Sequence, residues 1–447
     1  MEICTIGGYE QVGKNMTAVK VGEDVIILDA GVYLTPLIEL QEQEAHVKYD
    51  EKMLRKIKAI PNDLVLDKLG WTNKVKAIII GHAHLDHVGA LPYLAHRYPQ
   101  AEIIATPFTM EVLNSILEDD KLTLRNKKRT VHANSTLKLK GTNGEIKLEF
   151  IHTTHSTIQC VFVAWHTTEG TFFYALDFKF DKHPGIGDPP NYRRLKELGK
   201  KGVKCLVVDS LYSDTDRRTA SERIARNLLE DALSTIRDKK SALFVTTFSS
   251  HISRLKSIVE FGKKTKRQII FMGRSLNKYV EAARKVGECP FYNKIKLLKY
   301  RRQINAFLKN VDKNRGKYLI VCTGHQAEKG AILDRITKEE TPFKFRSGDN
   351  VIFSSSIIPV TPNINARERM DKKLRKKGVR LQTDIHVSGH GGREDLRDLV
   401  DMLKPKNIIP AHGTLEQEKP MVELAKELGY KSNQSVHLSS NGKVIKV

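Results

Sequence analysis

The sequence predicts an α/β protein made of two domains, one inserted into the other. Short apolar runs that end in histidine or aspartate occur before residue 210 and again after residue 360, which indicates one domain built from both ends of the chain. Between them, strand-like runs alternate with longer helical patterns, as is typical of a parallel α/β unit. A chain of 447 residues also exceeds one ordinary core. We expect residues 1–210 and 361–447 to form one domain and residues 211–360 the insertion.

In the first region, β-rich runs deliver polar side chains at their ends. Val25–Leu28 leads to Asp29, and the buried-strand pattern Val75–Ile80 leads to the segment His82–His87. This segment reads His-Ala-His-Leu-Asp-His, so three imidazoles and a carboxylate lie within six residues. Such density favours a metal site over isolated solvated histidines, and these ligand types suit Zn²⁺ better than Ca²⁺ or Mg²⁺.

The same pattern recurs further along the chain. His155, Asp177 and Asp209 each follow an apolar, β-rich run. In the middle region we expect helices at 221–239 and 250–261, separated and followed by strands at 242–247, 268–272, 318–323 and 350–354. Metal-capable residues then return in the tail, in His386–His390 and in His412 after the apolar run 407–411. The tail therefore completes the first domain.

The composition favours a reducing compartment and a polyanionic partner. The five cysteines are scattered, and the amino terminus lacks the features of a signal peptide. No apolar run approaches membrane-spanning length, so we expect a cytoplasmic protein without membrane contact. A net charge of +23 makes nucleic acid the default partner, although a host with a basic proteome would give the same value. Charge alone does not separate RNA from DNA.

The ligand inventory exceeds what one metal needs. Zinc sites use about four ligands, whereas seven candidates stand at strand ends: His82, His84, Asp86, His87, His155, Asp177 and His412. Seven ligands suit two metals with one carboxylate bridging. Such a pair can hold a hydroxide nucleophile and neutralise a phosphoryl oxygen, which favours phosphodiester hydrolysis.

These motifs resemble a known family. The segment His82–His87, with the later ligands, is similar to the metallo-β-lactamase fold. The inserted unit, with Asp209, His390 and His412 in that order, resembles its beta-CASP branch. Phe248-Ser249-Ser250, Gly273-Arg274-Ser275, Phe353–Ser356 and His386–His390 resemble ribonuclease J. The resemblance implies an αββα sandwich with an inserted parallel beta-CASP domain, and the archaeal form without an additional carboxy-terminal domain.

The resemblance also implies individual roles. His82, His84 and His155 would hold one Zn²⁺, Asp86, His87 and His412 the other, and Asp177 would bridge them, with Mn²⁺ as an alternative activating ion. Asp29 would orient a ligand histidine. His390 and Asp209, together with Asp86, would be catalytic, and His390 is the better general acid because an imidazolium donates a proton and stabilises the departing oxygen.

A second pocket would decide the direction of cleavage. Small hydroxyl and backbone donors suit a terminal phosphate, and the candidates for a 5′-monophosphate are Ser249, Ser250, Ser354, Ser355, His386, Ser388 and Gly389. For each serine the alternative is ordinary turn or capping chemistry. Lys179 follows Asp177 closely, and we expect it at the surface.

The leading hypothesis is a zinc-dependent, processive 5′-to-3′ exoribonuclease that acts by two-metal hydroxide attack on single-stranded RNA with a 5′-monophosphate. The family also implies a homodimer. An alternative is an endoribonuclease of the same branch, of the type that cleaves near transcript 3′ ends, although its archaeal members carry amino-terminal KH domains that we do not expect here. A silent RNA-binding scaffold would lack ligands, and none of the seven is missing.

Overall fold

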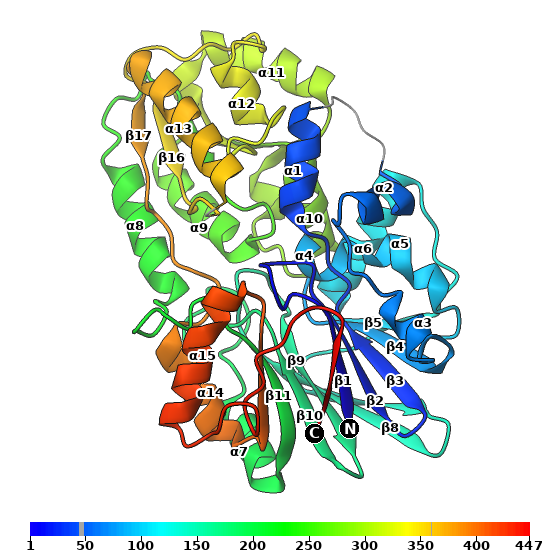
Figure 1. Cartoon of the computed structure of the whole chain (residues 1–447). Coiled ribbons are helices and arrows are strands. Elements are labelled where there is room, and N and C mark those ends of the chain that lie inside the picture. The colour runs from blue at the N-terminus through cyan, green and yellow to red at the C-terminus, as the bar shows by residue number, and fades with distance from the viewer. Residues whose placement is uncertain (44–48, 359) are drawn as a thin grey trace.

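The computed structural model describes residues 1–43, 49–358 and 360–447, and its strands form three sheets (Figure 1). The first sheet is mixed and has the order β19-β1-β2-β3-β4-β5-β6. Its strands are β1 (Glu2–Gly7), β2 (Met16–Val21), β3 (Asp24–Leu28), β4 (Val75–Ile80), β5 (Glu102–Ala105), β6 (Lys128–Thr130) and β19 (Lys443–Lys446). Both ends of the chain therefore meet in one sheet, because β19 pairs antiparallel with β1.

The second sheet is also mixed, and it packs face to face on the first. Its order is β18-β11-β10-β9-β8-β7. The strands are β7 (Ser135–Lys140), β8 (Glu145–His152), β9 (Val161–Thr167), β10 (Gly170–Ala175), β11 (Val203–Asp209) and β18 (Asn407–Ala411). A buried core that includes Ile79, Phe150 and Val207 fills the space between the two sheets. The parallel pairing of β11 with β18 places His412 beside the strands from the first half of the chain.

Helices cover both outer faces of this sandwich. The first sheet carries α2 (Glu51–Lys56), α3 (Val65–Lys68), α4 (Leu85–Val88), α5 (Leu91–Leu94) and α6 (Pro107–Asp120). Helix α1 (Leu34–Gln43) instead rises from the sandwich beside the inserted domain (Figure 1). The second sheet carries α7 (Tyr192–Lys201), α14 (Arg393–Leu403) and α15 (Leu415–Glu427). Short 3₁₀ helices lie at η1 (Thr72–Lys74), η2 (Ala95–Arg97), η3 (Tyr292–Lys294) and η4 (Arg315–Lys317).

The third sheet belongs to the insertion, and all of its strands are parallel. Its order is β14-β13-β15-β12-β16-β17, from β12 (Leu243–Thr246), β13 (Gln268–Met272), β14 (Lys296–Leu298), β15 (Tyr318–Cys322), β16 (Asn350–Phe353) and β17 (Arg380–Gln382). One face packs on α8 (Glu222–Ser234), α9 (Ile252–Lys264) and α10 (Arg274–Lys285). The other packs on α11 (Arg301–Lys313), α12 (Ile332–Thr337) and α13 (Thr361–Lys376). The predicted fold class, an α/β sandwich with an inserted parallel α/β domain, is confirmed.

The insertion extends past residue 360, where the sequence pattern had ended it. Helix α13 buries Met370 and Leu374 in the core of the third sheet, and β17 pairs in parallel with β16. The run that ends at His386 is therefore the exit from β17 and not a strand of the first domain. We accordingly use "inserted domain" for residues 211–382 and "metallo domain" for residues 1–210 and 383–447. Within the described residues, no helix is both long and apolar enough to span a bilayer.

Candidate metal centre

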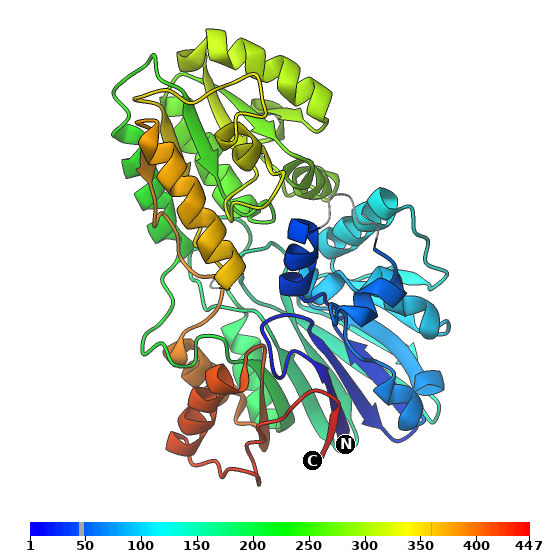
Figure 2. The ribbon, with the colours of Figure 1, turned by 45° about the horizontal axis from the view of Figure 1, so that its top comes forward.

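The seven predicted ligands converge because their strands end at the same place, where the sandwich meets the inserted domain (Figures 1 and 2). The segment His82–His87 follows β4, and His155 follows β8. Asp177 and His412 follow β10 and β18. One site is thus assembled from both ends of the chain.

Three residues at these strand ends have a left-handed backbone. The φ angles of Asp29, Asp177 and His412 are 61°, 51° and 66°. Positive φ is uncommon in residues other than glycine and costs about 1 kcal/mol or more, so surrounding contacts must hold it. The Asp29 N–H donates to Ile79 O at 2.8 Å, and the His412 N–H donates to Gly8 O. The reversed backbone turns each side chain out of the strand direction and into the site.

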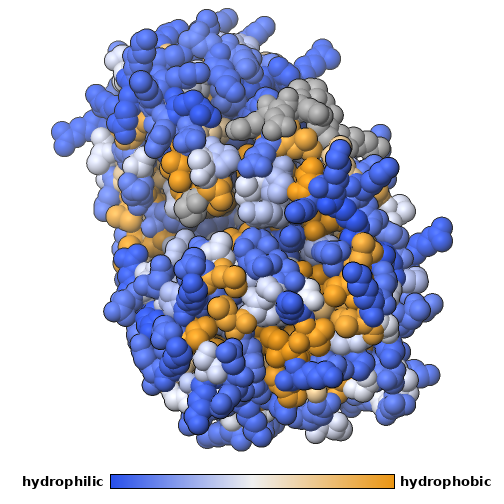
Figure 3. All heavy atoms as spheres, viewed as in Figure 1, coloured by the Kyte–Doolittle hydropathy of each residue, from blue (hydrophilic) through white to orange (hydrophobic). Residues whose placement is uncertain are grey.

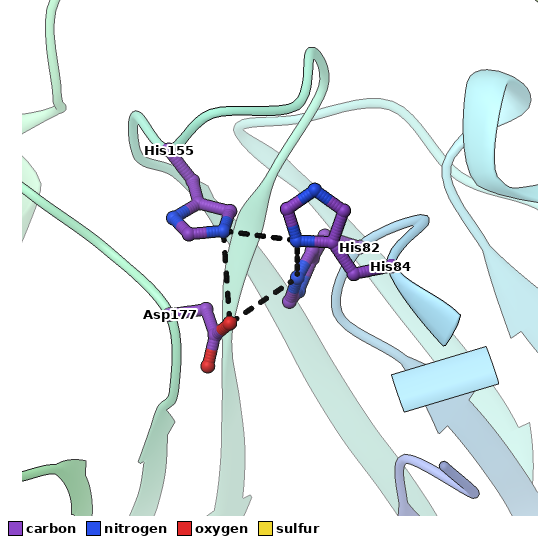
Figure 4. A group of neighbouring side chains, drawn as sticks. All are labelled: His82, His84, His155 and Asp177. Atoms are coloured by element: carbon purple, nitrogen blue, oxygen red, sulfur yellow. Dashed lines mark hydrogen bonds and ion pairs between the residues drawn. The ribbon is translucent and has the colours of Figure 1, made fainter. Parts of the chain in front are cut away.

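The first ligand group consists of His82, His84, His155 and Asp177 (Figure 4). Nδ1 of His84 lies 3.1 Å from Nε2 of His82 and 3.1 Å from Nε2 of His155. Oδ2 of Asp177 lies 3.5 Å from Nε2 of His82 and 3.6 Å from Nε2 of His155. A tetrahedral Zn²⁺ with bonds of about 2.0–2.1 Å spaces its ligand atoms about 3.3 Å apart. The observed spacing fits this ion.

The second group consists of Asp86, His87, His412 and the same Asp177. Nε2 of His87 lies 3.2 Å from Oδ1 of Asp177 and 3.6 Å from Oδ2 of Asp86. Nε2 of His412 lies 3.9 Å from the same Asp86 oxygen. Asp177 therefore presents one carboxylate oxygen to each group.

The electrostatics of the first group also fit a cation. Burial, reinforced by His87, holds the pKa of His82 well below its usual range, and burial with His84 does the same to the pKa of His155. Burial lowers the pKa of His84 to about 4. The three imidazoles are therefore neutral, and their nitrogens, with lone pairs available, face a shared carboxylate. Neutral imidazole nitrogens that point their lone pairs at one place cannot all be satisfied by one another, and a metal ion would satisfy them together.

Four of the five candidate ligand imidazoles are held through their other nitrogen, as metal-binding histidines generally are. His87 Nδ1 lies 2.7 Å from Asp29 Oδ2, which also accepts from the Tyr174 hydroxyl at 3.0 Å. His155 Nδ1 donates to the carbonyl of Gly389 at 2.7 Å. His84 Nε2 lies 3.1 Å from Oγ of Ser250, a residue of the inserted domain. Asp29 thus contacts a candidate ligand histidine, and its orienting role stays a prediction.

Asn15 holds the fourth imidazole, and sequence reasoning missed it. Its Oδ1 lies 3.0 Å from Nδ1 of His412, and its Nδ2 donates to the Asp86 carbonyl at 3.0 Å. The side chain is fully buried and so joins ligands from opposite ends of the chain. No sequence motif marked this residue, which follows a turn in which Gly13 and Lys14 both have positive φ.

His390 and Asp209 stand beside the ligand groups. Nδ1 of His390 lies 2.7 Å from Oδ2 of Asp209, and its Nε2 lies 3.8 Å from Oδ2 of Asp177. Its ring stacks on that of His412 at 5.3 Å between centroids. Burial opposes the charged form, but Asp209 and Asp177 together raise the pKa of His390 to about 9.

The candidates for phosphate binding come from three segments that contact one another. Ser249 and Ser250 follow β12, Ser355 follows β16, and His386 begins the loop to His390. Thr247 donates to Ser354 O at 2.7 Å, and the Phe248 and His386 rings are 6.0 Å apart. The buried Oγ of Ser355 and the buried Nδ1 of His386 have no hydrogen-bond partner among the described residues. Two unpartnered polar atoms in adjacent segments leave donors available to a ligand.

Two of the loop candidates also serve the scaffold. Ser388 Oγ accepts from the His390 N–H at 3.0 Å. Gly389 lies so close to the His155 ring that a Cβ there would be 2.8 Å from its Cε1. The loop between His386 and His390 is therefore fitted against a metal ligand.

Two expectations need correction. Ser354 is fully buried, and its hydroxyl donates to Ile385 O at 3.1 Å and accepts from Arg254 at 3.1 Å, so it supports the pocket from behind and does not face a phosphate. Lys179 is not at the surface: it is 3% exposed and lies 3.3 Å from Asp181. Both belong to a buried polar layer between the domains, which local sequence did not indicate.

Two sheets packed face to face, with histidine and aspartate ligands at their strand ends, define a metal-dependent hydrolase of the metallo-β-lactamase superfamily. Residues 10–173 match that superfamily, residues 240–370 match "Ribonuclease J, beta-CASP domain", and residues 378–435 match "Zn-dependent metallo-hydrolase RNA specificity domain".

Several similar proteins carry one name. The chain is 39% identical to "Ribonuclease J" of Methanocaldococcus jannaschii over its full length and 98% of that protein, and 40% identical to "Ribonuclease J" of Pyrococcus abyssi over 97% of that protein. "Ribonuclease J 1" of Streptococcus pyogenes is 30% identical over 99% of this chain and 74% of its own length. The chain belongs to the ribonuclease J family of phosphodiester hydrolases. A crystal structure of a protein of unknown function from Enterococcus faecalis, 16% identical with a TM-score of 0.66, covers 99% of both chains and shares the fold.

Proposed function

We propose that this protein is a zinc-dependent ribonuclease that degrades or matures RNA by processive 5′-to-3′ hydrolysis and prefers 5′-monophosphate ends. The observation that carries the proposal is the loop from His386 to His390. One end of the loop, His386, has an unpartnered buried nitrogen, as Ser355 of the inserted domain has an unpartnered buried hydroxyl, and the other end carries the His390 imidazole beside the candidate metal ligands. A short loop that links an anion pocket to the reacting centre favours cleavage at a fixed, short distance from a terminal phosphate.

The ligand set supports two zinc ions. His82, His84 and His155 would hold one, Asp86, His87 and His412 the other, and Asp177 would contact both. When bound, such a pair would lower the pKa of a water molecule and neutralise charge on the phosphoryl oxygens. The residues' own contribution is orientation, because Asp29, Asn15 and Gly389 fix the imidazoles that face the ions.

His390 is the proposed general acid that protonates the leaving group. In the proposed reaction a bond forms between water oxygen and phosphorus, and the bond from phosphorus to O3′ of the first nucleotide breaks. His390 Nε2 would give its proton to that departing oxygen, while Asp209 holds Nδ1. The shortened RNA then carries a new 5′-monophosphate. Because each product is again the preferred substrate, repeated cleavage follows naturally.

The 5′-phosphate would be bound by Ser249, Ser250, Ser355, His386 and Ser388, with Gly389 leaving room in the loop. Ser250 also contacts His84. This contact supports a separation of about one nucleotide between the pocket and the metals.

RNA labelled at its 5′ end tests the proposal. A 5′-monophosphate substrate is expected to release labelled mononucleotide from the first time point, and a matched 5′-hydroxyl substrate to react more slowly. Release of internal fragments from both substrates would overturn the exonuclease proposal and favour the endonuclease. Metal content measured by mass spectrometry should give two zinc ions per chain, and activity restored to a chelated sample by Mn²⁺ would identify the alternative ion.

We further propose that the protein is cytoplasmic, because its five cysteines are free. We also propose that it is a homodimer, on the basis of the family. Light scattering on the purified protein would give twice the chain mass if this is correct, and a monomer mass at micromolar concentration would contradict it.

A further inference from the structure

The excess positive charge of the chain lies almost wholly in one domain. The inserted domain contains 39 Lys and Arg against 17 Asp and Glu, whereas the metallo domain contains 36 against 35. The part of the chain that supplies the metal ligands is thus nearly neutral. The excess positive charge is therefore a property of the inserted domain.

Helix α13 concentrates this charge on one exposed face. Arg369, Lys372, Lys373 and Lys376 follow the spacing i, i+3, i+4, i+7, so they lie along one side of the helix. All four are exposed, and none has a carboxylate within 4.0 Å in the described part of the chain. The opposite side buries Met370 and Leu374. We call these four residues the α13 basic face.

A groove runs beside this face. It lies between α12 and α13, has a volume of about 330 Å³, and is lined by Arg369, Lys373, Lys338 and Lys329 together with Asp334 and Thr337. Asp334 supplies the one carboxylate of this lining, and Lys338 pairs with it at 2.9 Å, whereas Arg369 and Lys373 do not. Figure 3 shows that the surface of the inserted domain in this view is predominantly hydrophilic. The groove therefore favours an anion over an apolar ligand.

The α13 basic face leads outward from the active site. Helix α13 begins at Thr361, shortly after the segment Ser354–Ser356 of the phosphate pocket, and it packs against α1 of the metallo domain. From there it runs towards the outer end of the inserted domain (Figures 1 and 2). Sixteen residues at about 1.5 Å each give a helix about 24 Å long. The four charged residues lie in its outer half, over residues 369–376, and cover about 11 Å of the axis, a length that faces about two phosphates of an extended strand.

We propose that the α13 basic face binds the backbone of the RNA segment that lies outside the active site. The inference rests on the proposed function for its choice of partner, because fixed, unpaired cations attract any polyanion. The surface supplies affinity for long RNA and no chemistry. Its effect depends on substrate length and on salt.

The test replaces the four residues together by glutamine. Arg369→Gln, Lys372→Gln, Lys373→Gln and Lys376→Gln are combined, and the matched control changes four exposed lysines of the metallo domain, Lys140, Lys147, Lys201 and Lys406, to glutamine. Binding of a 40-nucleotide RNA to the metal-free full chain is measured by fluorescence anisotropy across a salt series, and cleavage of a 5-nucleotide RNA is measured with the metal-loaded enzyme.

The expected result is a loss of at least tenfold in affinity for the long RNA at low salt. Since each neutralised phosphate of a single strand contributes about 0.7 to the salt slope, the loss of about two phosphate contacts should reduce the slope by about 1.4. Cleavage of the short RNA and the behaviour of the control should stay within twofold of wild type. Unchanged affinity for the long RNA would overturn the inference. Binding of polyglutamate is measured in the same way, and a variant that loses only polyglutamate binding would also overturn it, because the partner of this face would then be an acidic protein.

Failure of the inference and failure of the proposed function give different results. A wild-type protein that binds long RNA through this face but cleaves no RNA would keep the inference and refute the nuclease. An active nuclease whose long-RNA binding ignores the four substitutions would do the reverse.

Discussion

The metallo domain and the inserted domain place their polar residues in opposite ways. In the metallo domain the functional histidines and carboxylates are mostly buried, and each is oriented by a hydrogen bond or an ion pair. In the inserted domain the excess charge is exposed, and on the α13 basic face it has no partner within the described residues. Chemistry at a reacting phosphorus requires fixed positions, which burial provides. Attraction of a long polyanion requires only accessible charge.

The two domains meet in a buried polar layer. Arg254 is fully buried and makes a bidentate pair with Glu222, at 2.5 and 2.8 Å. It also donates to the carbonyls of Ser354 and Ile385, at 2.9 and 3.1 Å. This guanidinium therefore holds the segments on either side of the candidate phosphate pocket. The candidate phosphate pocket and the candidate metal ligands keep their relative positions only if this layer holds the two domains together.

The largest expected effect comes from removing the shared carboxylate. Asp177→Asn should lower the cleavage rate by more than a thousandfold, because both ligand groups lose a charged ligand. Affinity for long RNA should stay within about threefold, since the basic charge lies elsewhere. Single-turnover cleavage and anisotropy on one preparation measure both. A parallel loss of RNA affinity would break the comparison between the domains.

The next largest effect concerns the layer between the domains. Arg254→Met leaves Glu222 buried without its partner, and breaking a buried pair in this way costs about 3–5 kcal/mol of unfolding free energy. Denaturant unfolding measures the loss. The double variant Arg254→Met with Glu222→Met is the control, because removing both charges should restore much of the stability. A single variant as stable as wild type would show that the pair does not hold the layer.

Gly389→Ala should have an intermediate effect. The added methyl group would approach the His155 ring at 2.8 Å and displace an imidazole whose Nδ1 is bound by the same residue's carbonyl. Disturbing such an orienting contact typically weakens metal affinity about 10–100-fold. Competition with a zinc chelator measures it. Gly262→Ala is the control away from the site, because Gly262 likewise has no positive φ and its added methyl group would meet only side-chain atoms of Leu319 and Ile269, at 3.0 and 3.2 Å.

The last expected effect is a pH dependence of stability in the metallo domain. Burial raises the pKa of Glu418 to about 9, and neither carboxyl oxygen has a hydrogen-bond partner among the described residues. Because the folded pKa lies above the unfolded value, this group contributes stability at low pH that is lost as pH rises between about 4.5 and 9. Glu418→Gln should flatten that decline. Thermal unfolding at pH 5 and pH 8 measures it, and an unchanged pH slope would show that Glu418 titrates normally.

The sequence by itself determined the inventory of the site. Histidine and aspartate at strand ends predicted His82, His84, Asp86, His87, His155, Asp177 and His412 as ligands, and all seven lie in the two groups. The alternation of strands and helices predicted the inserted parallel sheet, although its end lies beyond residue 360. The convergence of the seven residues and the inserted sheet could be foreseen because periodicity and residue type are local properties that a single segment carries, whereas metal binding by these residues stays a prediction.

Only the tertiary structure decided how those residues are held. The roles of Asn15, Gly389 and Arg254, and the burial of Ser354 and Lys179, depend on segments that are distant in the chain. No local pattern encodes such contacts, because a buried hydrogen bond is set by the packing of several elements at once. The unequal charge of the two domains was present in the sequence, but it acquired meaning only when the sheets showed where one domain ends and the other begins.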